Sequence, residues 1–224
     1  MKRLIIICEG ETEQGFCNTI LSPYFINKGI FVEAPLIKRS NGGIVRWEIL
    51  KKQIETTLAK EPSAYVTMLI DYYGLYHKFG FPGWSDSEQI VDKNDRMKYL
   101  ENQMSVDINE KVRYRFIPYL QLHEFEGILF CNVDVFKQII PANELLGMEE
   151  LEQVIAEYPN PEMINTSKET SPSHRLKRII LGYNKIVYGN IIAESIGLTT
   201  IRQKCPRFDF WLTYLEQLPE LRMK

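Results

Sequence analysis

Two short apolar runs, each ended abruptly by an acid, constrain the fold of this chain most strongly. Residues 4–8 and 65–70 are continuous hydrophobic stretches rich in β-branched side chains. Such runs are typical of central strands in a parallel sheet that is covered on both faces. Glu9 follows the first run and Asp71 follows the second. The pattern therefore predicts an α/β fold with acidic residues at the ends of its strands.

The segments around these runs alternate between helix-like and strand-like patterns. We expect further strands at 30–38 and 113–120, with Pro35 and Pro118 making them irregular. Thr12 is the expected N-cap of a first helix. The expected helices of this part of the chain are 13–28, 44–60 and 87–104. Alternation of this kind up to about residue 130 predicts a parallel sheet with helical crossovers.

Beyond residue 131 the strand signals fade and proline residues separate apolar helical patterns. The expected helices are 133–140, 143–158, 173–181, 190–196 and 208–218. We therefore predict an α/β core at 1–131 and a helical C-terminal part at 132–224, packed on the core. A chain of 224 residues is long enough to bury such a core without disulfides or metal.

Composition excludes several classes of protein. The formal net charge of −2 argues against a protein that coats DNA non-specifically, although it leaves room for a nuclease with a local basic patch. The four cysteines are dispersed, which disfavours structural zinc and predicts reduced core residues. We find no signal peptide and no apolar run of about 20 residues, so we expect a cytoplasmic protein without a membrane segment.

Acidic residues gather at one expected edge of the sheet. Glu9 and Asp71 end two strands, Glu13 lies one helical turn after Glu9, and Glu124 and Glu126 follow the last strand. Ligands of open parallel sheets bind at this edge. Carboxylates that lie close together need a cation, and oxygen ligands favour Mg²⁺ or Mn²⁺. We therefore predict that all five hold metal, with Glu9, Asp71 and Glu124 as catalytic residues in phosphoryl transfer.

Each acid also has a simpler interpretation. An acid after a strand is often a cap for the next helix, and the segment containing Glu124 and Glu126 could be a solvated turn. If that segment is extended, the two acids share a face. His123 beside them could transfer protons or only hydrogen-bond its neighbours.

Basic and aromatic residues supply candidate contacts to nucleic acid. Arg175 and Lys177 begin an expected helix, and Lys185 and Arg202 could extend the patch towards phosphate. A solvated helix face is the alternative. The aromatic side chains of the loop at 72–84 could stack on bases, but we favour an anchor for the loop itself or a patch for a protein partner.

The order of strand, Glu and helix, then strand and Asp, then a later acidic pair resembles the layout of Toprim domains. The chain is more closely similar to a bacterial family of Toprim-like proteins, through the stretches 9–13, 70–74, 81–83, 123–130, 172–175, 183–185, 196–198, 201–202 and 205–208. This resemblance implies a Mg²⁺-dependent nuclease, an ABC-type ATPase partner and a role in phage defence. Tyr73 departs from the pattern, because a typical Toprim domain has Asp at that position.

The expected function is metal-dependent cleavage of DNA or RNA. The rival is a non-catalytic interaction subunit, which uses the same scaffold to dock or regulate an ATPase or nuclease. Tyr73 and the slightly negative charge favour the rival, whereas the acids at the strand ends favour the enzyme. The sequence leaves open whether the chain forms a homo-oligomer and which nucleic acid it takes.

Overall fold

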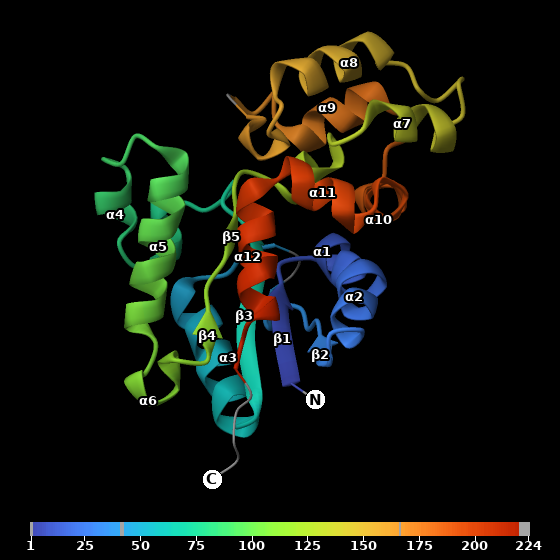
Figure 1. Ribbon diagram of the computed structural model, residues 1–224. Coiled ribbons are helices and arrows are strands. Elements are labelled where there is room, and N and C mark those ends of the chain that lie inside the picture. The colour runs from blue at the N-terminus through green and yellow to red at the C-terminus, as the bar shows by residue number, and fades with distance from the viewer. Residues whose placement is uncertain (1, 41–42, 166, 220–224) are drawn as a thin grey trace. The chain divides into compact units, whose positions relative to one another are not determined.

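The computed structural model describes residues 2–40, 43–165 and 167–219 (Figure 1). The chain forms two compact units, and we describe each by itself. The first consists of residues 1–122 together with 216–224, and the second of residues 123–215. The division that we expected at residue 131 falls inside the second unit.

A parallel sheet forms the centre of the first unit (Figure 1). Its strands are β1 (Lys2–Cys8), β2 (Ile30–Glu33), β3 (Ala64–Asp71), β4 (Phe116–Ile117) and β5 (Leu120–Gln121). Their order is β2-β1-β3-β4, and β5 pairs with the end of β3. Every pairing is parallel, as the α/β prediction requires.

The two apolar runs form the central strands for a simple physical reason. All five residues at 4–8 and all seven at 64–70 are buried, so neither strand needs a polar face. The outer strands are short where proline interrupts them. β2 stops before Pro35, after which a single bridge pairs Leu36 with Cys8, and Pro118 separates β4 from β5. The irregularities expected from these prolines are confirmed.

Helices connect the strands of the first unit. They are α1 (Glu11–Phe16), α2 (Ser22–Ile26), α3 (Trp47–Lys60), α4 (Trp84–Ser87), α5 (Lys93–Asp107) and α6 (Glu110–Arg113). A π-helical turn, Cys17–Leu21, joins α1 to α2, so the helix expected at 13–28 is continuous but not regular. Trp47 and Lys51 of α3 donate hydrogen bonds of 2.7 and 3.0 Å to Asp107, which holds α3 beside the end of α5.

The second unit is helical. It contains α7 (Val133–Ile139), α8 (Met148–Glu157), α9 (Pro172–Ile179), α10 (Lys185–Ile196), α11 (Leu198–Lys204) and α12 (Pro206–Glu216), with short 3₁₀ turns at Phe125–Leu129 and Pro161–Met163. The last residue of α12 belongs to the first unit. Helices occur at all five expected places, and α11 is the one that the sequence did not predict.

The four cysteines are buried and free, as expected for reduced core residues. The sulfur atoms of Cys8 and Cys17 lie 3.7 Å apart, and those of Cys131 and Cys205 are equally close. Burial raises the pKa of the Cys17 and Cys205 thiols well above their ordinary value. These thiols are therefore poor nucleophiles and serve as apolar packing groups.

Candidate functional site at the carboxyl ends of β1 and β3

Glu9 and Asp71 lie together at one edge of the sheet. β1 and β3 are parallel neighbours in which Cys8 pairs with Leu69, so both strands end at the same edge. The backbone N–H of Asp71 donates a hydrogen bond of 3.1 Å to Oε2 of Glu9. Both acidic side chains are half-buried. The structure therefore brings together the two acids that the strand ends predicted.

Glu13 lies near this pair, but its carboxylate forms a capping hydrogen bond at the start of α1. Gly10, and not Thr12 as we expected, is the N-cap of α1. Since Gly10 has no side chain to cap the helix, Glu13 folds back and accepts the Gly10 N–H at 2.9 Å. A Cβ atom at position 10 would lie 3.0 Å from Oε2 of Glu13, so glycine leaves room for that carboxylate. The buried Glu13 thus supports the turn that carries Glu9.

The loop after Asp71 is partly anchored by its own aromatic residues. Tyr72 stacks on Trp84 with ring centroids 5.7 Å apart, and Phe81 packs against Trp47 of α3 at 5.4 Å. Other aromatic residues of the loop remain accessible. Tyr76 is 55% exposed and stacks on Phe79. The interpretation of the loop as a self-anchoring segment therefore holds for Tyr72, Phe81 and Trp84, but not for Tyr76.

Glu124 and Glu126 lie in the second unit, where they do not form the extended pair that alternation suggested. Glu124 precedes a 3₁₀ turn that contains Glu126. Both oxygens of Glu124 accept hydrogen bonds from Ser173 at the start of α9, one from the backbone N–H at 2.9 Å and one from the hydroxyl at 3.0 Å. Glu124 therefore caps a helix, and both acids are buried. Their predicted role as metal ligands stays a prediction.

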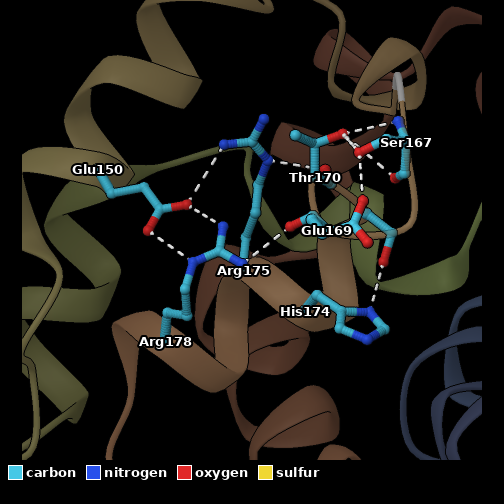
Figure 2. A network of polar contacts seen from close by, with 8 residues as sticks. Glu150, Ser167, Glu169, Thr170, His174, Arg175 and Arg178 are labelled. Atoms are coloured by element: carbon cyan, nitrogen blue, oxygen red, sulfur yellow. Dashed lines mark hydrogen bonds and ion pairs between the residues drawn. The ribbon is translucent and has the colours of Figure 1, made fainter.

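The basic residues predicted to hold phosphate are engaged to different degrees. Figure 2 shows Arg175 and Arg178 converging on Glu150. Their ion pairs with Glu150 measure 3.3 and 2.5 Å, and Arg175 also donates to the carbonyl of Thr170. Arg202 forms an ion pair with Asp209. Lys177 and Lys185 are exposed on the same unit. Arg175 and Arg202 thus serve helix–helix contacts, and phosphate binding by these residues remains a prediction.

A buried acid that the sequence did not single out occupies the start of α12. Glu162 accepts the backbone N–H groups of Arg207 and Phe208 at 2.9 and 3.0 Å. Burial raises the pKa of Glu162 from 4.5 to about 7, although these two hydrogen bonds and the charge of Arg207 oppose the shift. No sequence signal pointed to this role, because the partner helix begins more than 40 residues further along the chain.

Glu162 makes the stability of the second unit depend on pH. Between about pH 4.5 and 7 the folded state holds a proton on Glu162 that the unfolded state has released, so the free energy of unfolding falls as the pH rises. A shift of this size corresponds to roughly 3 kcal/mol across the window. We expect urea denaturation at several pH values to show this slope, and Glu162→Gln to flatten it. The exposed Glu149→Gln is the control, and an equal slope in both variants would contradict the assignment.

The residues at the edge fit a divalent cation only as a site with few protein ligands. Within residues 2–40, 43–165 and 167–219, no group of three or more His, Cys, Asp or Glu side chains is arranged to hold a metal ion. Mg²⁺ commonly binds through one or two carboxylates and completes its shell with water and substrate phosphate. Glu9 and Asp71 supply such a pair.

Fold and edge together define an α/β protein with an acidic pair at the carboxyl ends of two neighbouring parallel strands. The chain belongs to a family described as a domain of unknown function (DUF4276), whose model matches residues 8–216. No curated protein and no solved structure matches the chain. Among the helices of the described residues, none is long and apolar enough to cross a membrane.

Proposed function

We propose that the chain is a divalent-metal-dependent nuclease that cleaves phosphodiester bonds of DNA or RNA at the edge carrying Glu9 and Asp71. One observation carries the proposal: the hydrogen bond from the Asp71 backbone to the Glu9 side chain, which joins two acids at the ends of adjacent parallel strands. This edge is where open α/β sheets bind their ligands. The resemblance to Toprim domains supports the same assignment.

The roles of the residues follow from their positions. Asp71 and Glu9 would hold Mg²⁺ or Mn²⁺, which supplies charge stabilisation at a phosphate oxygen and acidifies a bound water. The hydrogen bond from Asp71 fixes the orientation of Glu9, while Glu13 holds the Gly10 turn in place. As an alternative to binding metal, Glu9 would act as a general base or acid. We extend the proposal, from the resemblance alone, to an ABC-type ATPase partner and a role in phage defence.

A cleavage assay with controlled metal tests this proposal. We expect the purified chain, alone or with the partner ATPase, to cleave single- or double-stranded DNA or RNA with Mg²⁺ or Mn²⁺, and to stop when EDTA removes the metal. Glu9→Gln should abolish the same activity. Glu110→Gln removes an equal charge from an exposed position at the start of α6 and should change nothing. Cleavage that persists in EDTA, or equally in Glu9→Gln, would refute the proposal.

A non-catalytic interaction subunit is the second candidate, and the exposed face of α10 favours it. Ile186, Val187 and Ile191 are each more than 40% exposed on that helix. Clustered apolar side chains of this kind are typical of protein-binding surfaces. This candidate predicts that Val187→Asp disrupts assembly with a partner while Asp71→Asn has no effect on any property of the chain.

A further inference from the structure

A basic pocket lies on the first unit, between the segment that follows β2 and the first half of α3. Its volume is about 350 Å³, within the range of small-molecule sites. The residues that matter for its chemistry are Lys38, Arg39, Glu48, Lys52, Gln53 and Thr56. Lys38 and Arg39 come from the exit of β2, and the other four come from α3.

The charge of this pocket is positive and uncompensated. Lys38, Arg39 and Lys52 face a single acid, Glu48, in a chain whose formal net charge is −2. In the part of the chain that the structure describes, none of the three cations forms an ion pair. Cations gathered in a concave surface without their own acids attract an anion from solution.

The walls of the pocket are fixed by a buried glutamine. Gln53 is 7% exposed, accepts the Lys38 N–H at 2.7 Å and donates to the Leu36 carbonyl at 3.0 Å. Arg39 then adopts a left-handed backbone conformation with a φ of 63°, which non-glycine residues seldom do. Residues held in such sparsely populated conformations cluster at binding sites. Lys38 and Arg39 are therefore held at a set turn beside α3.

The segment that leads into the pocket lies beside the edge of the sheet that carries Glu9. The Ile37 N–H donates to the Cys8 carbonyl at 3.0 Å, so the chain leaves β2 alongside the end of β1. The same segment then returns to Glu9, because a Cβ atom at Gly43 would lie 4.0 Å from Oε1 of Glu9. The positive pocket and the acidic pair are thus neighbours along one edge of one unit.

We infer that this pocket binds a backbone phosphate of a nucleic-acid strand, next to the phosphate at which the acidic pair would hold its metal ion. The inference rests on the proposed nuclease function and names its substrate contact. Guanidinium and ammonium groups are the usual partners of phosphate oxygens, and Thr56 adds a hydroxyl to the set. A cation site beside a carboxylate site gives the strand one fixed direction across the edge.

Oligonucleotide binding without metal tests the inference separately from cleavage. A fluorescein-labelled single-stranded 12-mer is titrated in EDTA at several salt concentrations and followed by anisotropy. We expect Lys52→Gln and Arg39→Gln each to weaken binding about three- to tenfold and to reduce the salt slope by about one, because each removes one phosphate contact. Lys60→Gln is the matched control, since Lys60 is exposed on the same helix about 12 Å further along its axis.

The outcomes separate the pocket from the catalytic proposal. Weaker binding in the pocket variants supports the inference even if no cleavage is ever found. Wild-type affinity and salt slope in both pocket variants overturn it, even if Asp71→Asn abolishes cleavage. Failure of the wild type to bind the 12-mer, with inorganic phosphate bound instead in a way that Lys52→Gln removes, also overturns it, because the pocket would then be a site for free phosphate.

Discussion

Replacement of Asp71 by asparagine is expected to lower the rate of metal-dependent cleavage about a thousandfold and to leave the fold unchanged. The substitution keeps the size of the side chain, and the backbone N–H that donates to Glu9 remains in place. It removes one of two carboxylates available to the cation at this edge. Loss of several kcal/mol of electrostatic stabilisation in the transition state corresponds to about three orders of magnitude in rate.

The measurement is single-turnover cleavage of a labelled oligonucleotide at saturating protein. Circular dichroism and the urea midpoint of the variant should match the wild type. Asp71 is the last residue of β3 and is not fully buried, and asparagine keeps the size of its side chain. Glu110→Gln is again the control for loss of one negative charge in the same unit. A variant that cleaves within threefold of the wild-type rate would remove Asp71 from the mechanism.

Replacement of Arg115 by methionine should destabilise the first unit by about 3 kcal/mol. Arg115 is 4% exposed and donates to three backbone carbonyls at 2.8 to 2.9 Å, those of Leu58 in α3, Glu61 just after it and Ala64 at the start of β3. Methionine fills part of the volume but leaves the buried carbonyls of Leu58 and Ala64 without this donor, and each such loss costs about 1–3 kcal/mol. The Glu61 carbonyl keeps the Ala64 N–H at 3.1 Å. The cation also complements the negative end of the helix dipole.

Urea denaturation monitored by tryptophan fluorescence measures this effect, because Trp47 and Trp84 both belong to the first unit. Lys111→Met, at an exposed position of α6, is the matched control and should change the midpoint little. If the free energy of unfolding of Arg115→Met falls by less than 1 kcal/mol, water replaces the guanidinium. The importance given to Arg115 as a donor to these carbonyls would then be wrong.

The parts of the fold that the sequence predicted are those decided by local patterns. The runs at 4–8 and 65–70 had no polar face, so only a strand covered on both sides could bury them. Pro118 removes a backbone donor from the last strand, and the sheet is divided at that point. The edge bearing Glu9 and Asp71 followed from the rule that parallel strands end together, and the structure confirms that the two acids are neighbours.

The errors lie where long-range contacts decide the local structure. The spacing of Glu124 and Glu126 is that of two residues on one face of a strand. In the structure Ser173 at the start of α9 donates to Glu124, and a 3₁₀ turn follows Glu124. Thr12 is a residue type that often caps helices. The contact between Gly10 and Glu13 nevertheless makes Gly10 the N-cap of α1. Arg202 forms an ion pair with Asp209 that the sequence did not indicate, and its binding of phosphate stays a prediction.

The basic pocket was missed for a different reason. Lys38 lay inside the strand expected at 30–38, whereas β2 ends at Glu33 and leaves Lys38 and Arg39 in the segment that follows it. The two cations form a basic pocket only together with Lys52, which comes close to them when α3 packs along the segment after β2. Gln53 supplies that packing through two backbone hydrogen bonds to Leu36 and Lys38, and nothing in the spacing of these residues indicates such a clamp.

Titration of Mn²⁺ into the protein, with free Mn²⁺ followed by electron paramagnetic resonance, tests whether Glu9 and Asp71 hold a metal ion. The titration is made with a phosphorothioate oligonucleotide present, so that a site completed by substrate oxygen is also detected. We expect one Mn²⁺ bound per wild-type chain, loss of that ion in Asp71→Asn, and retention in Glu110→Gln. No bound Mn²⁺ in the wild type, or equal binding in Asp71→Asn, would contradict a metal-dependent nuclease at this edge.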